Sequence, residues 1–299
     1  MAQSDHWVFV GFGEAAHGLM LAGFLKSNLP TVCLPTGRAP SADTRRRLRD
    51  CGLTSTADPS AVQKGDVVLS LVTPDAALDA AQIVAPSLRP GAFYVDMNSI
   101  AGTTAAAIAE VVEGRGARFV DAAVMGPVPL MGLAVPIWLS GADAVEFHAV
   151  AATRGLTTTV LSARPGDASS LKMLWSVMTK GTIALLAEAL TGAHRLGLLG
   201  PLLELLGREY GNTGSSAMVL RMLRSTAVSG TRRLQEMDEA RKTLCSVAVP
   251  SWTVDAAIRW IATLAAMPAI AGEQTVPDVV KALSDALREA RDVLPTRSP

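Results

Sequence analysis

Cysteine is scarce in this chain of 299 residues, and Cys33, Cys51 and Cys245 lie far apart with no CxxC spacing among them. Such usage excludes a disulfide framework and a structural zinc site, and it fits a reducing cytoplasm. The four histidines are equally scattered, and no pair of them has metal-ligand spacing. We therefore expect a cytoplasmic protein without a metal.

A surplus of charge of one sign is also missing. The 27 basic and 27 acidic residues balance to a net charge of 0, and no dense basic block stands out beyond Arg45-Arg46-Arg47, which argues against nucleic-acid binding. The first predicted strand begins near Trp7, which leaves no room for a signal segment before it. The most apolar long stretch, Trp260 to Gly272, is too short to span a bilayer and contains Pro268. We expect no nucleic acid and no membrane as partners.

Apolar residues are abundant, at 49% of the chain, and the length exceeds the roughly 100 to 200 residues typical of one domain. Short β-type runs alternate with helical patterns over the first half, which is typical of a doubly wound parallel sheet. We expect an α/β Rossmann domain over residues 1–165. Its predicted strands are Trp7–Val10, Thr31–Leu34, Asp66–Leu71, Phe93–Met97, Arg118–Ala122, Ala134–Leu139 and Thr157–Leu161.

The second half has helical periodicity and no convincing strand, so residues 166–299 are expected to form an all-α substrate and dimerisation domain. A long helix is predicted from Gly166 to about Leu199, where Gly200-Pro201 stops it, and it joins the two domains. The further predicted helices are Leu202–Tyr210, Ala217–Ser225, Arg232–Val247, Ser251–Met267 and Val276–Val293.

The first strand runs into the spacing Gly11-x-Gly13-x-x-Ala16. The first glycine permits a tight strand-to-helix turn, the second lets the backbone approach a pyrophosphate, and the third small residue allows close packing of helix on strand. The following helix N-terminus offers free amides and a positive dipole end to phosphates. The pattern predicts a dinucleotide site formed by Gly11, Phe12, Gly13, Glu14 and Ala15. An ordinary strand-turn-helix connection is the alternative.

Four further motifs follow in order. Leu71-Val72-Thr73-Pro74 and Asp96-Met97-Asn98-Ser99 end two strands, Asp121-Ala-Ala-Val-Met125-Gly126 lies in and after a third, and Gly166-Asp-Ala-Ser-Ser-Leu-Lys172 begins the long helix. Together with the glycine turn they resemble the β-hydroxyacid dehydrogenase superfamily, which includes 6-phosphogluconate and 3-hydroxyisobutyrate dehydrogenases. The similarity is greatest to the branch with the C-terminal domain of unknown function 1932.

The resemblance implies that Lys172 is the general acid/base on the substrate hydroxyl or carbonyl. Hydride arriving at a carbonyl carbon leaves charge on the oxygen, and a positioned proton donor accelerates this step. The alternative is an ordinary surface lysine. The resemblance also assigns Val72, Thr73, Pro74 and Asn98 to the cofactor, although Asn98 and Ser99 equally suit a strand-end turn.

The substrate side departs from the family pattern in two places. Ser176 stands where the superfamily usually has asparagine, four residues after the lysine, and Met125-Gly126-Pro127 replaces Ser-Gly-Gly. These changes weaken the expectation that small β-hydroxy acids are the substrates. The substrate-binding residues expected from the motifs are Ser99, Met125, Gly126, Trp175 and Ser176.

Cofactor choice depends on the end of the second strand, where an acidic side chain would bind the ribose diol of NAD. The segment Leu34-Pro35-Thr36-Gly37-Arg38 has none. Because Thr36 and Arg38 can meet a 2′-phosphate, NADP(H) is favoured and NAD(H) remains open.

These observations predict an NADP(H)-dependent oxidoreductase acting on a carbonyl or secondary alcohol of a small, anionic substrate. Arg221, Arg224, Arg232 and Arg233 are candidates to hold the anion, or are solvated surface residues. An imine reductase with another proton donor and a noncatalytic dinucleotide-sensing protein are the alternatives. The resemblance implies a homodimer, with Trp260 to Ala271 as part of its contact.

Overall fold

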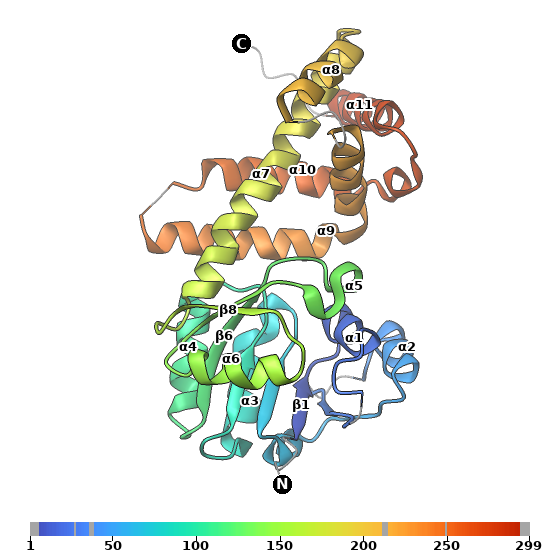
Figure 1. Ribbon diagram of the computed structural model, residues 1–299. Coiled ribbons are helices and arrows are strands. Elements are labelled where there is room, and N and C mark those ends of the chain that lie inside the picture. The colour runs from blue at the N-terminus through green and yellow to red at the C-terminus, as the bar shows by residue number, and fades with distance from the viewer. Residues whose placement is uncertain (1–5, 27, 36–38, 211–214, 249, 294–299) are drawn as a thin grey trace. The chain divides into compact units, whose positions relative to one another are not determined.

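The computed structural model describes residues 6–26, 28–35, 39–210, 215–248 and 250–293. The chain forms two compact units, residues 1–174 and 175–299. Helix α7 (Asp167–Arg195) begins in the first unit and continues into the second. Figure 1 shows the sheet of the first unit and the helices of the second.

The first unit is built on one sheet of eight strands in the order β3-β2-β1-β4-β5-β6-β7-β8. The strands from β3 to β6 are all parallel. Their bounds are β1 Trp7–Val10, β2 Thr31–Cys33, β3 Ser55–Thr56, β4 Val67–Ser70, β5 Phe93–Asp96, β6 Arg118–Val124, β7 Ile137–Ser140 and β8 Thr158–Ser162. The predicted α/β Rossmann sheet is confirmed, and the two-residue strand β3 was not predicted.

Strand β7 differs from the expectation of a parallel sheet, because it runs antiparallel to β6 and parallel to β8. Between β6 and β7 lie only the short helix α5 (Val128–Met131) and the 3-10 turn η4 (Gly132–Ala134). A parallel return needs a longer crossover connection, so this link turns the chain back directly.

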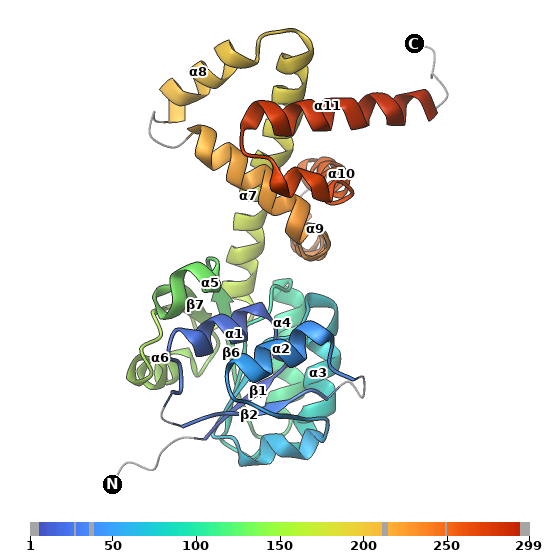
Figure 2. The same cartoon turned by 90° about the vertical axis from the view of Figure 1, so that its right-hand side faces the viewer.

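Helices cover both faces of the sheet (Figure 2). One core cluster joins the sheet to α1 (Glu14–Leu21), α2 (Ala42–Asp50) and α6 (Ala144–Thr153), with Trp7, Phe9 and Phe24 at its centre. The other joins the opposite face to α3 (Ala77–Val84) and α4 (Gly102–Glu113). This two-sided cover is what parallel strands require.

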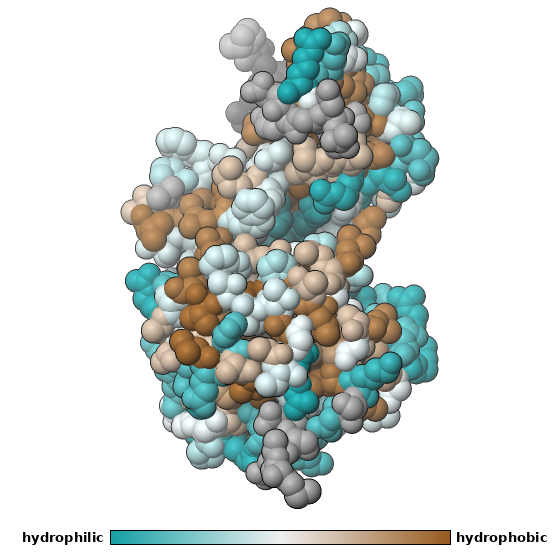
Figure 3. Space-filling model, viewed as in Figure 1, coloured by the Kyte–Doolittle hydropathy of each residue, from teal (hydrophilic) through white to brown (hydrophobic). Residues whose placement is uncertain are grey.

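At the β8 edge the sheet is less well covered. The residues of β8 alternate between half-buried and exposed, and Figure 3 shows apolar residues on the surface over β8 and α6. The exposed fractions of Val145 and Leu161, from these two elements, are 70% and 39%.

In the second unit, the described residues form helices around two apolar clusters. The helices are the rest of α7, α8 (Leu199–Tyr210), α9 (Ser215–Ser246), α10 (Trp252–Ala265) and α11 (Val276–Val293), with the 3-10 turn η5 (Pro268–Gly272) after α10. The predicted all-α C-terminal region is confirmed. The long helix ends earlier than expected, because Gly197 (φ +72°) closes it and Gly200-Pro201 lies in the first turn of α8.

Helix α9 joins two predicted helices across a kink. Ser229 has non-helical angles (φ −107°, ψ 21°), and Gly230 follows it. A β-carbon on Gly230 would lie 2.2 Å from Cβ of Ala265 in α10. The kink therefore occurs at a Ser-Gly pair where a second helix packs backbone-close, a known cause of helix bending.

Helix α7 is long and apolar enough, by length and composition, to cross a membrane, whereas the sequence pattern pointed to Trp260 to Gly272 as the most apolar long stretch. Of its most apolar 18-residue window, 47% is buried inside the protein.

Candidate active site

The glycine turn lies between β1 and α1. Gly11 has φ +87°, and a β-carbon there would lie 2.5 Å from the carbonyl oxygen of Leu71. Its close approach is thus to the end of β4, in addition to the tight turn that the spacing predicts. A β-carbon on Gly13, in contrast, would meet nothing within 4 Å. Gly13 leaves open space at the helix start, which suits an approaching pyrophosphate.

Helix α1 begins with Gly13 at its N-cap and no side chain capping its amides. Glu14 is exposed, Ala15 is half-buried, and Phe12 is 2% exposed and packs against Phe9. The first-turn amides of this helix can therefore receive a phosphate. Phe12 can take part through its backbone, because its ring belongs to the core.

The ends of β4 and β5 are tied together by Asn98. Its Oδ1 accepts from the amide of Val72 (2.8 Å), while its Nδ2 donates to Ser70 Oγ (2.9 Å) and Asp96 Oδ2 (2.8 Å). Both amide hydrogens of this buried side chain are engaged within the protein. Asn98 thus supports the strand-end turn. Of the neighbouring residues, Thr73 is exposed and Ser99 is half-buried.

Four buried polar residues form a row across the sheet. Ser70, Asp96, Asp121 and Ser140 stand on β4, β5, β6 and β7 and pair in register. None of them is more than 1% exposed. Buried carboxylates need partners. Asn98 supplies them for Asp96, and the start of α7 supplies them for Asp121.

The carboxylate of Asp121 accepts hydrogen bonds from the start of α7. Its Oδ2 accepts from the Ser169 amide (2.9 Å) and from Ser140 Oγ (3.0 Å), and its Oδ1 accepts from Ser169 Oγ (2.6 Å). The hydroxyl of Ser140 in turn accepts from the Ala168 amide (3.0 Å). Burial raises the pKa of Asp121, and the hydrogen bonds from Ser169, Ser140 and Gly166 oppose the rise. A carboxylate from β6 thus satisfies backbone amides at the positive end of the long helix.

Lys172 follows Ser169 by one turn of α7 and is half-buried. Burial raises the pKa of Asp96 to about 7, helped by the charge of Asp121 and opposed by hydrogen bonds from Asn98 and by the charge of Lys172. Lys172 therefore lies near enough to act electrostatically on Asp96. A lysine beside a buried carboxyl group, at the carboxyl ends of the parallel strands, can exchange a proton with a bound oxygen.

The remaining substrate candidates lie in different places. Met125 is half-buried and its amide donates to the Pro136 carbonyl (2.8 Å), while Gly126 is exposed before α5. Trp175 and Ser176 belong to the second unit. There Trp175 is 56% exposed, and the buried Ser176 accepts a hydrogen bond from Lys180 (3.2 Å).

Thr36 and Arg38, expected at the 2′-phosphate, lie outside the described residues. Nearby, Ser41 caps α2 through the amide of Thr44 (3.1 Å), and Arg45 donates to the Pro40 carbonyl. Arg46 pairs with Asp43 (3.1 Å). The chain just beyond Arg38 is thus held by local contacts.

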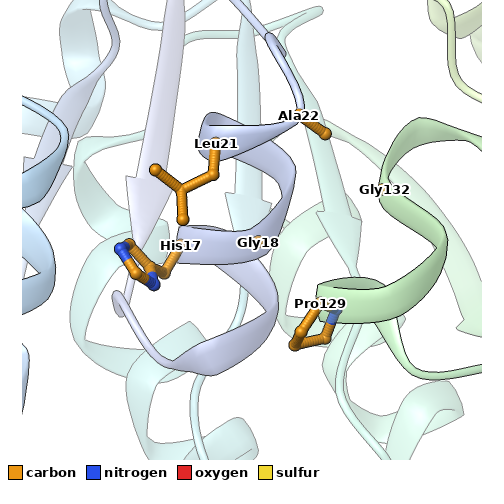
Figure 4. Close-up of a pocket in the computed structure, with 6 residues that line it drawn as sticks. All are labelled: His17, Gly18, Leu21, Ala22, Pro129 and Gly132. Atoms are coloured by element: carbon orange, nitrogen blue, oxygen red, sulfur yellow. The ribbon is translucent and has the colours of Figure 1, made fainter.

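A surface cavity of about 260 Å³ lies between α1 and α5 (Figure 4). It is lined by His17, Gly18, Leu21, Ala22, Pro129 and Gly132. His17 Nε2 lies 3.4 Å from Asp50 Oδ2 at the end of α2. None of the lining residues is a predicted site residue, so this cavity is separate from the predicted site.

Sequence reasoning gave no role to Asp96, Asp121 or Ser140. The sequence did contain a sign of their importance, because acidic and hydroxyl residues inside strands that are otherwise apolar need hydrogen-bond partners when they are buried. Which donor forms a hydrogen bond with each of them depends on the register of the strands, which the sequence alone did not supply.

Comparisons with known proteins agree with this geometry. Residues 11–152 match the NAD binding domain of 6-phosphogluconate dehydrogenase, and residues 193–264 match a domain of unknown function, DUF1932. An uncharacterized 28.5 kDa protein of Methanothermus fervidus is 30% identical over 239 residues, covering 80% of this chain and 90% of the relative.

Two solved structures extend the match over nearly the full chain. A conserved hypothetical protein of Sinorhizobium meliloti is 32% identical with a TM-score of 0.74, covering 95% of this chain and 97% of that one. A conserved protein of unknown function, described as structurally similar to 3-hydroxyacid dehydrogenases, is 37% identical with a TM-score of 0.68, covering 89% and 99%.

Proposed function

We propose a hydride-transfer reaction for this chain, which belongs to the family of NAD(P)-dependent oxidoreductases that joins a 6-phosphogluconate dehydrogenase-like NAD binding domain to a DUF1932 domain. The reaction interconverts a carbonyl and a secondary alcohol. The nicotinamide supplies or accepts the hydride when bound, and this chain supplies the proton.

Lys172 is the residue proposed to move that proton. Its nearness to Asp96, in the first turns of the helix held by Asp121, is the observation that carries the proposal. In reduction its Nζ–H donates a proton to the substrate oxygen as the carbon receives hydride, and in oxidation the neutral amine takes the proton back. Positioned acid/base catalysis of this kind contributes about 10²- to 10⁴-fold in rate.

The first unit fits a dinucleotide at the glycine turn. The open space beside Gly13 and the uncapped amides of α1 support binding of the pyrophosphate. We propose NADP(H) in preference to NAD(H), because residues 34–38 contain no acidic side chain for a ribose diol and include Arg38 for a 2′-phosphate. Arg38→Asp is expected to reverse the preference, measured as the ratio of dissociation constants for NADPH and NADH.

We expect a cytoplasmic homodimer, as the family resemblance implies. The stretch Trp260 to Ala271 is a poor candidate for the contact, because Ile261, Leu264 and Ile270 are fully buried within the second unit. A better one is the exposed apolar stripe of Trp175, Met178 and Leu185 on α7, which are 56%, 65% and 67% exposed. Met178→Glu should therefore yield monomers in light scattering.

Turnover tests the function directly. The purified chain is assayed with NADPH or NADP⁺ against hydroxy acids, ketones and imines, and Lys172→Ala is compared with the exposed control Lys64→Ala. We expect Lys172→Ala to lower kcat by about 10²- to 10⁴-fold with nearly unchanged NADPH affinity, and Lys64→Ala to be silent.

Each other outcome selects an alternative. Tight NADPH binding without turnover of any substrate would favour a noncatalytic sensor. Imine reduction that survives Lys172→Ala would favour a different proton donor. Failure to bind any pyridine nucleotide would overturn the proposal as a whole.

A further inference from the structure

Asn98 is 3% exposed and lies among the ends of β4 and β5. Its backbone amide donates to Asp96 Oδ1 (3.0 Å), and its Nδ2 donates to Asp96 Oδ2 (2.8 Å) and to Ser70 Oγ (2.9 Å). Its Oδ1 accepts from the Val72 amide (2.8 Å). Because a backbone amide only donates, this last bond also fixes which end of the carboxamide faces β4. Both Nδ2 hydrogens are thus used inside the protein, so the side chain has no hydrogen left to donate to a bound molecule.

The bond to Val72 extends the pairing of β4 and β5 beyond the ends of the strands. The Met97 amide donates to the Ser70 carbonyl (3.0 Å). In a regular parallel ladder, the next bond along would join the Val72 amide to the Met97 carbonyl. The side-chain carbonyl of Asn98 takes the place of that acceptor. The position of the Val72 peptide therefore depends on one side chain.

Val72 lies where a sheet of this kind binds ligands. The strand order reverses between β1 and β4, and the crevice outside the carboxyl ends of the strands at such a switch point is the usual ligand site. Gly11 follows β1, and Val72 follows β4. A β-carbon on Gly11 would fall 2.7 Å from Cγ1 of Val72 and 2.5 Å from the Leu71 carbonyl oxygen. A shift of the Val72 peptide would therefore displace the glycine turn as well.

We propose that Asn98 is a positioning residue of the dinucleotide site, which holds the Val72 peptide against the Gly11 turn and acts on the cofactor through that peptide. The inference rests on the proposed function, which assigns the dinucleotide to the glycine turn. It replaces the direct cofactor contact that the motif suggested for Asn98, because the donors of this side chain are engaged. Groups that bind a ligand keep their geometry when further hydrogen bonds lock them from behind. Asn98, anchored on Asp96, supplies such a bond.

Two measurements on the full-length protein test this role. In Asn98→Ala, the dissociation constant for NADP⁺ should rise about tenfold, because the Val72 amide loses its acceptor. In the absence of nucleotide, hydrogen exchange of the Val72 amide should accelerate about tenfold or more, while amides inside β4 and β5, such as those of Leu69 and Val95, keep their wild-type rates. Gln82→Ala, which removes an exposed carboxamide from α3, is the control and should match the wild type in both.

Asn98→Asp tests whether the acceptor is the group that matters. The new carboxyl group keeps an acceptor for the Val72 amide and loses the Nδ2 donors. Burial raises the pKa of Asp96 to about 7, so at pH 6 Asp96 can donate its proton to the new carboxylate. We therefore expect Asn98→Asp at pH 6 to bind NADP⁺ within about threefold of the wild type. Equal weakening in Asn98→Asp and Asn98→Ala would contradict the role of Oδ1.

The outcomes separate this inference from the proposed function. If the wild type binds no pyridine nucleotide, the proposed function fails and so does this inference. If the wild type binds NADP⁺ and Asn98→Ala binds it as tightly as Gln82→Ala, the positioning role alone is overturned. Weaker binding with an unchanged exchange rate at Val72 also overturns it, since Asn98 would then contact the cofactor directly. If Asn98→Ala does not fold, Ser70→Ala, which removes one acceptor of Nδ2, is judged against Gln82→Ala by the same criteria.

Discussion

The backbones of Gly102 and Gly166 lie directly against each other. A β-carbon on Gly166 would fall 2.3 Å from the carbonyl oxygen of Gly102, and one on Gly102 would fall 2.1 Å from Ser170 Oγ and 2.5 Å from the Gly166 carbonyl oxygen. Gly166 also has φ +91°. Two glycines thus let the start of α7 contact the start of α4, and Lys172 lies less than two turns beyond.

Gly102→Ala should therefore displace the start of α7. We expect a loss of about 1 to 3 kcal/mol in the free energy of unfolding, the usual cost of overpacking, measured by urea denaturation. Gly192→Ala, in an open position of the same helix, is the control and should stabilise by up to about 1 kcal/mol. If both variants behaved alike, the Gly102–Gly166 contact would have no special role.

The hydroxyl of Ser169 offers a second test of how α7 is held. Ser169→Ala removes the 2.6 Å hydrogen bond to Asp121 Oδ1 and keeps the amide bond to Oδ2. Because the acceptor is a buried carboxylate, we expect a loss of about 1.5 to 3 kcal/mol in unfolding free energy. Ser170→Ala is the control, since no side-chain hydrogen bond of Ser170 is found among the described residues. Equal effects of the two substitutions would show that the hydrogen bond from Ser169 to Asp121 does not stabilise the fold.

The turns of the candidate site were predictable from the sequence, whereas the contacts between its strands were not, because they depend on the register of the sheet. The glycine turn and the strand ends are local signals, because neighbouring residues determine each turn. The partners of Asp96 and Asp121 come from other strands and from α7, and only the register of the sheet brings them together. The sequence placed Lys172 on the right helix but could not supply the carboxyl group beside it.

In the helical unit, too, a contact between segments distant in sequence decided a feature that the sequence did not predict. Periodicity predicted helices on both sides of Ser229, but α9 runs through that position with a kink. Whether a Ser-Gly pair ends a helix or bends it depends on what packs there, and Ala265 comes from a distant segment. Tertiary packing decided a point that local propensity left open.

The contact between Gly230 and Ala265 leads to a third prediction. Gly230→Ala would place two β-carbons 2.2 Å apart, so we expect a loss of about 1 to 3 kcal/mol in unfolding free energy. Adding Ala265→Gly should restore part of it, although glycine at the end of α10 costs up to about 1 kcal/mol by itself. Thermal denaturation of the single and double variants measures the coupling, and strictly additive losses would contradict the contact.

The buried carboxyl group of Asp96 predicts how stability changes with pH. Its pKa is raised from 3.8 to about 7, mainly by burial, so between these values the folded protein holds a proton that the unfolded chain releases. This contribution to stability is complete below pH 4 and is lost as pH rises through 7, with a slope of at most about 1.4 kcal/mol per pH unit.

Asp96→Asn should remove this contribution, because an amide does not titrate. Urea denaturation between pH 4.5 and 7.5 should therefore show a smaller fall in unfolding free energy with rising pH for Asp96→Asn than for the wild type. Asp75→Asn, at an exposed carboxyl group, should leave the wild-type slope unchanged. The raised pKa of the neighbouring Asp121 acts in the same direction, so part of the slope should persist in Asp96→Asn. Parallel profiles for the wild type and Asp96→Asn would mean that the Asp96 carboxyl group is ionised throughout this range, despite its burial beside Asp121.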